Sequence, residues 1–504
     1  MNDIFRFAFR AVRRNKGFTL LNITGLAIGV ATCLLIILYV QDEFSYDRFH
    51  LSSKDIVRVT YNFFDRQKGV LYENASAPNI IPSWLKENFP VVKQTARLFR
   101  PYPPTVVISE GNRVFEENQF FYADSGFFRV FDGYEARYGD LHTALSEPET
   151  IVLSASMAQK YFGDENPVGK YLRYNNRSEF RVSAVLQEPS GKSHLMFDFL
   201  ASDLGIGAAN NLRWDSPNYF VYALLQPETQ AESFRAAINK EIGNENVSLG
   251  IQRLEDIHLR SQLIGEAAPN SDIRYLYIFS VIAMLVLAIA CINYVNLATA
   301  RAPERAREVG MLKVVGADQR QLFWKFVLEA VFGVVPALLL AQILVEISLP
   351  WFNSLTNKQI AMGDVSTTTL AGVLLGLLVL VSALAGVYPA LVMSRYQPIQ
   401  VLKGKFSSQA RGVILRKTLV GLQFTVSMFL MIGAVIMYSQ LSFLQQKNLG
   451  YDKEQLLTLR MDRQAFQTKL DVLRNEFMAT PYVADVAASM LSPLAVPAPN
   501  PCNM

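Results

Sequence analysis

The residues that could do chemistry form patterns that fall short of the common catalytic and nucleotide-binding motifs. Gly163–Lys170 resembles a phosphate-binding loop, but five residues separate its glycines where four are needed, and Tyr171 replaces Ser or Thr. The run Gly191–Ser193 lacks the upstream glycine. The sequence also contains neither Gly-x-Ser-x-Gly nor His-Glu-x-x-His. We therefore expect any ATP that drives this protein to bind another subunit.

The histidines and cysteines are too scattered to predict a metal site or a disulfide framework. The histidines are His50, His142, His194 and His258, and the cysteines are Cys33, Cys291 and Cys502. Cys33 and Cys291 lie in apolar runs. The acids scattered between residues 41 and 272 are most simply a solvated face, with a hidden catalytic pair of carboxylates as the alternative. The chain is thus expected to be non-catalytic and to bind no cofactor directly.

One polar stretch, Arg301–Ala317, predicts a short helix between two apolar segments. Pro303 suits the first turn of a helix, and Gly316 suits its end. Asp318 and Gln321 are spaced to cap the helix that follows. The sequence therefore predicts a short helix that stops sharply before a membrane span.

This short helix is apolar on one side. Val309, Leu312 and Val315 recur three residues apart, and charged residues occupy the other side. Such a helix could dock in a groove of a cytoplasmic partner, or it could be a linker that touches only lipid headgroups. Periodicity alone does not decide between the two.

Apolar windows long enough to cross a bilayer organise the rest of the chain. Among 504 residues, 51% are hydrophobic and only 18% are charged, which excludes a disordered chain and disfavours a soluble one. Four windows carry no charge: Phe18–Val40, Tyr275–Ala300, Val365–Ser394 and Thr418–Gln446. Each exceeds the roughly 20 residues that a span needs. Phe326–Ile347, which contains Glu329 and Pro336, is a weaker fifth candidate.

The charges of the loops predict the orientation of these spans. Residues 1–17, 300–320 and 393–417 are rich in Lys and Arg, whereas residues 41–272 hold 23 basic and 31 acidic side chains. Basic short loops stay in the cytoplasm. Five spans with a cytoplasmic N-terminus and an extracytoplasmic C-terminus satisfy every loop. The net charge of +4 gives no reason to expect nucleic-acid binding.

Two spans contain Gly-x-x-x-Gly, which lets helix backbones approach closely in lipid. The glycine pairs are Gly25/Gly29 and Gly372/Gly376. Glu329 lies near Lys325 and is expected to reach the inner interface instead of forming an ion site.

The segment between the first two spans is long enough for a folded domain outside the cytoplasm. Alternating strand patterns and amphipathic helical patterns predict a mixed α/β domain. The strands are expected at Ile56–Tyr61, Thr105–Ser109, Phe180–Leu186 and Tyr219–Leu225, and the helices at Ile80–Asn88 and Glu232–Ile242.

A weak internal repeat links the segment after the first span to the segment after the fifth. Tyr46-Asp47 follows the first span, and Tyr451-Asp452 follows the fifth. The repeat predicts that a second copy of the span-plus-domain unit begins near Arg416. That copy would be incomplete, so the chain is interpreted as cut short.

Three motifs resemble those of ABC-transporter permeases of the MacB/FtsX type. Glu308–Ala317 is similar to that family's E-I-G-x-x-x-A-x-G-A loop, with Val314 in place of an alanine. Tyr388–Ala390, followed by Ser394-Arg395 and Pro398–Lys403, is similar to the stretch that closes the family's fourth span. Tyr161–Gly163 with Asn166–Lys170 resembles a signature of the MacB-like periplasmic core domain. The first span and the basic residues before it also fit.

This resemblance implies an α-helical transmembrane bundle with a mixed α/β (α+β) extracytoplasmic domain, in the bacterial inner membrane. The expected boundaries are a cytoplasmic-surface helix at 1–17, spans at 18–40, 273–300, 321–347, 365–394 and 418–442, a MacB-like periplasmic core domain at 41–272, a coupling helix at 301–320, a short outer loop at 348–364, a cytoplasmic loop at 395–417, and the start of a second periplasmic domain at 443–504.

The resemblance also implies a function. The coupling helix would take a push from cytoplasmic ABC ATPase subunits that hold ATP and Mg²⁺, and the spans would move the outer domain to export or release a peptide, lipoprotein or drug-like cargo. The implied coupling residues are Glu308, Val309, Gly310, Leu312, Val315, Gly316 and Ala317. Further expected partners are membrane lipid, a second permease unit in a homodimer or heterodimer, and a periplasmic protein.

Two other function classes compete with the ABC permease. An FtsX-like scaffold or sensor would regulate a periplasmic partner without moving cargo. An ion-coupled carrier would need polar, broken helices at mid-membrane, for which Glu329 and Pro336 are weak candidates.

Overall fold

A computed structural model describes residues 16–65, 69–102, 104–188, 191–207, 211–243, 246–300, 302–364, 366–394, 410–447, 457, 459 and 463–488. The chain divides into two units, Met1–Phe429 and Leu430–Met504. Most of the surface helix expected at 1–17 and most of the loop expected at 395–417 lie outside the described residues.

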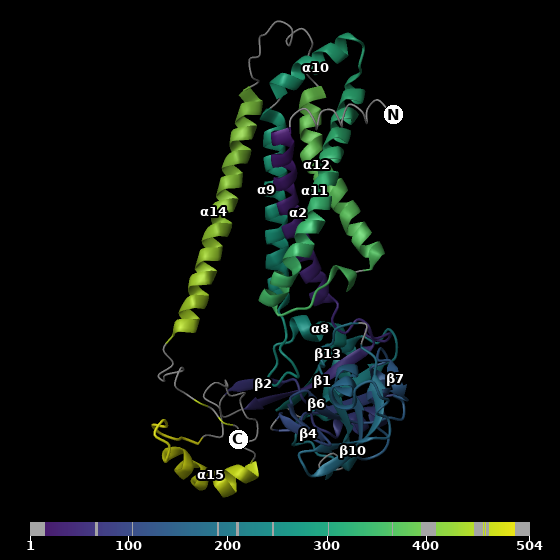
Figure 1. Cartoon of the computed structure of the whole chain (residues 1–504). Helices are drawn as coiled ribbons and strands as arrows, with labels where there is room; N and C mark the ends of the chain where they lie inside the picture. Colours follow the sequence, from purple (N-terminus) through teal and green to yellow (C-terminus); the bar gives the residue numbers. More distant parts are fainter. Residues whose placement is uncertain are drawn as a thin grey trace. The chain divides into compact units, whose positions relative to one another are not determined.

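Five long helices in the described residues are apolar enough to cross a membrane. They are α2 (Lys16–Phe44), α9 (Ile273–Ala300), α11 (Gln319–Thr356), α12 (Thr367–Ser394) and α14 (Ala410–Gln446), and Figure 1 shows their order along the chain. Each window predicted from the sequence lies within, or largely within, one of these helices. The chain is a multi-pass membrane protein, and the predicted fold class is confirmed.

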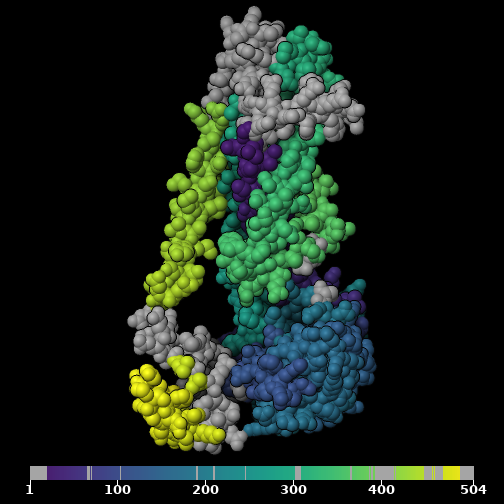
Figure 2. All heavy atoms as spheres, in the orientation of Figure 1, coloured from purple at the N-terminus to yellow at the C-terminus, as the bar shows by residue number. Residues whose placement is uncertain are grey.

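Helix α2 is the centre of the bundle because it packs against both α9 and α11, and α12 packs on α11. Apolar side chains from these helices form one buried core. In the space-filling view α2 appears in purple as a strip beside α11 (Figure 2). The contact with α9 is close at Gly29, where an added Cβ would lie 2.5 Å from the Cβ of Ala290.

Helix α11 continues beyond the predicted span. Residues 348–356, expected to be part of an outer loop, form its last turns. Phe352 still packs against the bundle core, so the apolar stripe that holds the helix extends past residue 347. The helix ends at Asn357, which has a φ of 52° and a backbone N–H that donates to the Asn353 carbonyl.

A large mixed α/β domain, which we call the outer domain, is inserted between α2 and α9. Its described residues contain a 13-stranded sheet with the order β13-β1-β12-β3-β6-β11-β8-β10-β9-β4-β5, while β2 pairs with β1 and β7 with β10. The strands are β1 (Ile56–Asp65), β2 (Val70–Asn74), β3 (Val92–Phe99), β4 (Val106–Glu110), β5 (Arg113–Glu117), β6 (Phe120–Ala123), β7 (Ala136–Gly139), β8 (Thr150–Leu153), β9 (Tyr171–Tyr174), β10 (Ser178–Leu186), β11 (Phe199–Ser202), β12 (Tyr219–Leu225) and β13 (Val247–Arg253).

Most neighbouring strands are antiparallel, and the pairs β8/β10 and β6/β11 are parallel. Short helices cover the sheet: α3 (Ile81–Asn88), α4 (Phe127–Val130), α5 (Ala155–Phe162), α7 (Ala231–Ile242) and α8 (Leu254–Arg260). Helices α3 and α7 share a core with β1, β12 and β13, whereas α5 shares another with β8 and β10. The strands and helices predicted for this domain are all found, within a few residues of their expected ends.

The C-terminal unit contains one further described helix, α15 (Arg463–Met478). The sequence interpretation of this region as the start of a second outer domain stays a prediction.

Candidate functional site

The first candidate site is the short helix α10 (Ala302–Val314), which joins α9 to α11. The N-terminal end of α9 adjoins the outer domain, and α10 follows the C-terminal end of α9. Helix α10 therefore lies at the end of the bundle that is far from the outer domain (Figure 1). This is the helix that the sequence predicts to contact a partner.

The end of α10 is closed by backbone hydrogen bonds. The Ala317 N–H donates to the Leu312 carbonyl at 2.9 Å, and the Gly316 N–H donates to the Lys313 carbonyl at 3.1 Å. Gly316 has a φ of +101°, a conformation that suits glycine. This Schellman pattern ends the helix at the expected place.

The next helix begins directly after this stop. Asp318 caps α11 in a reciprocal capping box with Gln321, as its sequence spacing predicts. Only four residues separate α10 from α11, and their backbone groups are held by these two caps. The two helices are therefore joined by a short turn whose backbone is hydrogen-bonded at both ends.

The apolar face of α10 is used differently from the expected arrangement. Val309 is only 1% exposed and packs with Leu322, Phe326 and Ala390 of α11 and α12. Leu312 and Ala317 pack against the same cluster. These side chains hold α10 to its own bundle, so Val309 is not free to fill a groove of another protein.

A second apolar stripe is exposed on α10 and the turn that ends it. Met311, Val314 and Val315 are 61%, 67% and 87% exposed. They recur at i, i+3 and i+4, the spacing of one helix face. We call these three residues the outer stripe of α10. Of these three, only Val315 is among the residues that the sequence assigns to the partner contact.

A polar contact also fastens α10 to α11. The Lys325 ammonium lies 2.5 Å from the Glu308 carboxylate. Glu308 was expected at the edge of a partner groove, but here it pairs within the chain. Gly310 is buried. The role of α10 and its residues in coupling stays a prediction.

The two Gly-x-x-x-Gly motifs occupy different surroundings. Gly25 and Gly29 face α9, where an added Cβ would lie 3.3 Å from the Asn293 amide nitrogen and 2.5 Å from Ala290 respectively. No described atom lies within 4 Å of a Cβ added to Gly372 or Gly376. That Gly372 and Gly376 pair with another helix stays a prediction, and the partner helix would have to come from another molecule or from residues outside the described ones.

The second candidate site is a buried polar cluster where α2 meets the outer domain. Glu43, near the end of α2, accepts a 2.8 Å hydrogen bond from His258 of α8. Its other oxygen lies 2.7 Å from the ammonium of Lys358, just beyond α11. Tyr46 stacks on the His258 ring with 3.5 Å between centroids. We call Asp42, Glu43, Tyr46, His258 and Lys358 the junction cluster.

A second line of polar contacts runs from the junction cluster into the outer domain. Lys192 pairs with Asp42, and the Ser193 hydroxyl donates to Asp47 at 2.6 Å. His194 bridges Asp47 and the Tyr222 hydroxyl at 2.8 and 2.7 Å. Burial alone would raise the pKa of Asp47, but His194 and Ser193 hold that pKa below its usual range.

Deeper in the domain, Arg58 on β1 is fully buried and paired with Glu266 through two hydrogen bonds of 2.6 and 3.0 Å. Burial would raise the pKa of Glu266, but the Arg58 guanidinium holds it below its usual value. An intact buried pair of this kind fixes where α8 and the following loop lie on the sheet.

The two glycine–lysine stretches rejected as phosphate loops have structural roles. Gly191–Ser193 supplies Lys192 and Ser193 to the contacts described above. Gly163–Lys170 forms turns in which Gly163 and Gly169 have φ values of 68° and 89°. Within the described part of the chain, no group of three or more His, Cys, Asp or Glu side chains could hold a metal ion.

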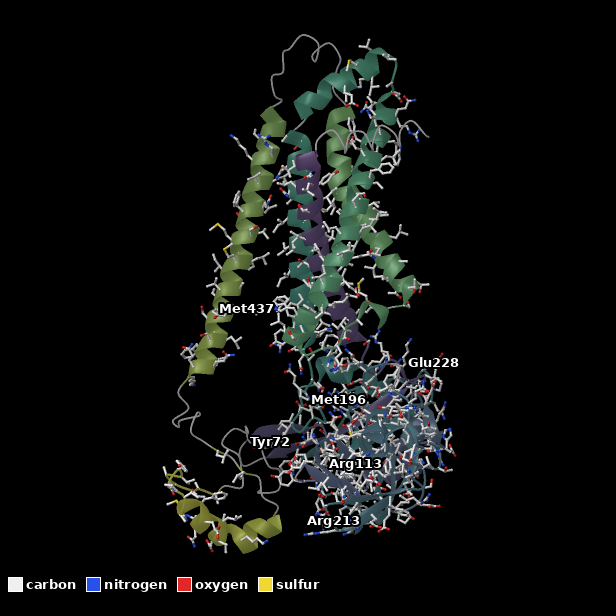
Figure 3. All side chains as sticks on the ribbon, in the orientation of Figure 1. Tyr72, Arg113, Met196, Arg213, Glu228 and Met437 are labelled. Atoms are coloured by element: carbon white, nitrogen blue, oxygen red, sulfur yellow. The ribbon has the colours of Figure 1, made fainter. Side chains whose placement is uncertain are left out.

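A cavity of about 410 Å³ lies beside the junction cluster. Its lining includes Lys192 and Met196 of the outer domain together with Asn357, Lys358 and Gln359 beyond α11. Figure 3 labels Met196 on the side of the outer domain nearest the bundle. Water can therefore reach Lys358 from one side, which agrees with its 13% side-chain exposure.

Sequence reasoning missed the junction cluster because its members come from three distant segments. The only available signal was the acidic and aromatic run Gln41–Asp47, which was used for the internal repeat. His258 and Lys358 are isolated polar residues in the sequence, and only the fold brings them to Glu43.

Two family models match the chain. Residues 19–241 match the MacB-like periplasmic core domain, and residues 280–398 match the FtsX-like permease C-terminal region. The first covers most of α2 and most of the outer domain, and the second covers α10, α11, α12 and residues 280–300 of α9.

Several curated proteins are similar at low identity. The macrolide export ATP-binding/permease protein MacB of Aggregatibacter actinomycetemcomitans is 23% identical, over 45% of this chain and 34% of that protein. The pyoverdine export ATP-binding/permease protein PvdT of Pseudomonas syringae pv. syringae is 24% identical, over 69% and 54%. The chain thus spans between a third and about half of these export proteins.

An uncharacterized ABC transporter permease of Methanocaldococcus jannaschii is 22% identical over 80% of this chain and 98% of that protein. Among solved structures, the periplasmic region of MacB from Actinobacillus actinomycetemcomitans is 15% identical over 42% of this chain and 92% of that chain, with a TM-score of 0.31. The extracellular domain of the transporter YknZ from Gram-positive bacteria is 16% identical over 39% and 99%, with a TM-score of 0.29.

Proposed function

Since the chain belongs to the MacB/FtsX type of ABC transporter permeases, we propose that it is a non-catalytic membrane subunit that passes the movement of a cytoplasmic ABC ATPase to its outer domain. ATP and Mg²⁺ would bind the ATPase and not this chain. The N-terminus and α10 would face the cytoplasm of a bacterial cell, in keeping with the basic residues around α10.

The observation that carries this proposal is the outer stripe of α10. Met311, Val314 and Val315 are exposed, while Val309 and the Glu308–Lys325 pair fix the helix to its own bundle. A helix held on one side and apolar on the other can insert into a partner's groove and transmit a push. Burial of three such apolar side chains in the contact would also contribute favourable free energy to binding of the ATPase.

Export is the role that we propose for the complex. Two of the similar proteins carry export in their names, for a macrolide and for pyoverdine. Cargo would be handled by the outer domain, outside the cytoplasm. Two permease units would face each other in such an assembly, as a homodimer or heterodimer surrounded by lipid, with a periplasmic protein as a further partner.

The test is co-purification of the ATPase with a permease that carries Met311→Asp and Val314→Asp. Two carboxylates in the stripe should abolish co-purification and permease-dependent ATP turnover, because an apolar groove cannot accept them without a large desolvation cost. Leu51→Asp is the matched control, since Leu51 is 89% exposed on the outer domain. If the double variant still binds and stimulates the ATPase, the stripe is not the contact.

A further inference from the structure

Lys358 lies just beyond the C-terminal end of α11, the helix that follows α10. Helix α11 is helical throughout Gln319–Thr356, with Pro336 and Pro350 in its interior, and 38 residues at 1.5 Å each span roughly 57 Å. Its first turn is capped directly after α10, and Lys358 follows its last turn by two residues. One continuous helix therefore connects the coupling helix with the junction cluster.

The backbone around Lys358 is tied to α11. The Lys358 N–H donates to the Asn353 carbonyl at 3.1 Å. The Asn353 side chain donates to the Ile360 carbonyl at 2.8 Å and accepts from the Ile360 N–H at 3.1 Å. These bonds make residues 358–360 an extension of the helix end, so Lys358 moves when α11 moves.

The side chain of Lys358 reaches the base of the outer domain. Its ammonium lies 2.7 Å from Glu43, 3.2 Å from Asp42 and 3.2 Å from the Tyr46 hydroxyl, and it also lies over the Tyr46 ring at 4.9 Å. Burial alone would lower the pKa of Lys358, but Glu43 and its neighbours raise it above its usual value. The side chain is thus held in its charged form between two carboxylates.

Glu43 joins this cation to the outer domain itself. The carboxylate is 2% exposed and contacts Lys358 with one oxygen and His258 of α8 with the other. Removing one partner of a buried ion pair leaves a charge without compensation, so such a pair resists separation more strongly than a surface pair does. The three segments that meet here are α2, α8 and the end of α11.

We propose that Lys358 is a positioning residue that fastens the outer end of α11 to the base of the outer domain. A displacement that α10 gives to α11 then reaches the outer domain through this side chain, in addition to the covalent connections through α2 and α9. The transmission step rests on the proposed function, whereas the fastening itself does not require an ATPase.

The test measures the distance between spin labels at Leu355 and Glu228 in the full chain, purified in lipid nanodiscs. Leu355 is exposed near the end of α11, and Glu228 is exposed on the outer domain, where Figure 3 labels it. The three native cysteines are replaced by alanine in this background. In the parent protein we expect a single narrow distance without nucleotide.

Lys358→Met should abolish the narrow distance, and Lys358→Arg should restore it, because Arg also pairs with carboxylates. The double variant Lys358→Met/Glu43→Gln removes the uncompensated charge, so a loss of the narrow distance there reports loss of fastening and not misfolding. Lys192→Met is the matched control, since Lys192 also pairs with Asp42 but does not follow α11. We expect Lys192→Met to keep the narrow distance.

A narrow, unchanged distance in both Lys358→Met and Lys358→Met/Glu43→Gln would overturn the proposal, as would an equal loss of the narrow distance in Lys192→Met. Two further label pairs, Met284 of α9 with Leu355 and Met284 with Glu228, measured with the ATPase and ATP, separate the two claims, since Met284 is exposed on the bundle. If ATP changes neither distance in the parent protein, the proposed function fails, while the nucleotide-free result on Lys358 still stands.

Discussion

Substituting Gly29 should weaken the bundle through a steric clash with one identified atom. The Cβ of Gly29→Ala would lie 2.5 Å from the Ala290 Cβ, whereas carbon atoms in contact prefer about 3.5–4.0 Å. Helices α2 and α9 would have to separate by about 1 Å at this point. Such overpacking typically costs about 1–3 kcal/mol.

The second glycine motif provides a control for helix propensity. Replacing Gly by Ala favours a helix by up to about 1 kcal/mol wherever it occurs. Gly372→Ala and Gly376→Ala receive this gain with no described neighbour within 4 Å. The difference in unfolding free energy between Gly29→Ala and Gly372→Ala therefore isolates the steric cost, which we expect to be about 1–3 kcal/mol.

The assay is reversible unfolding of the full chain in mixed micelles, followed by circular dichroism. The double variant Gly29→Ala/Ala290→Gly removes the clashing carbon, so the two substitutions should couple favourably by about 1 kcal/mol or more. A Gly29→Ala protein as stable as Gly372→Ala would refute the reasoning. If Gly372→Ala is the destabilised one, that glycine packs against another molecule.

Three further substitutions test single features of the structure. Asp124 lies in the turn between β6 and α4, and Asp203 directly follows β11. Burial, followed by the charge of Asp203, raises the pKa of Asp124 to about 7 from 3.8, so the folded state keeps a proton that the unfolded state loses between these values. The unfolding free energy should therefore fall by up to about 4 kcal/mol as pH rises from 4 to 8, and Asp124→Asn should remove this component in pH-dependent melting curves. Gly316→Ala should destabilise by about 1–2 kcal/mol because of its φ of +101°. Gly376→Ala is the control in the same melts and should show only the helix-propensity gain of up to about 1 kcal/mol. Asp318→Ala should cost about 1 kcal/mol by removing the capping box, while Asp318→Ser should retain most of the stability.

The membrane helices and the outer domain were predictable because their signals are local. A charge-free window such as Phe18–Val40 exceeds any ordinary buried helix, and a run such as Tyr219–Leu225 has the composition of a strand. The caps at Gly316 and Asp318 were also predictable, since each depends on residues a few positions apart.

Which face of α10 packs against its own bundle was not predictable from the same kind of signal. Both Val309/Leu312 and Met311/Val314 are apolar pairs at helical spacing, so the sequence permits either pair to face inward. Packing against Leu322 and the other residues of that cluster decides the matter. The junction cluster was harder still, because Glu43, His258 and Lys358 are more than 90 positions apart in sequence.

The outer domain begins and ends at neighbouring points, because Glu43 at the end of α2 is hydrogen-bonded to His258, shortly before α9. A domain whose two ends meet can be replaced by another without changing the path of the host helices. Chimaeric permeases could therefore be assembled by grafting a foreign domain between Phe44 and Ile273. The graft would need to supply an imidazole or an equivalent donor for Glu43, so that this carboxylate keeps both of its partners.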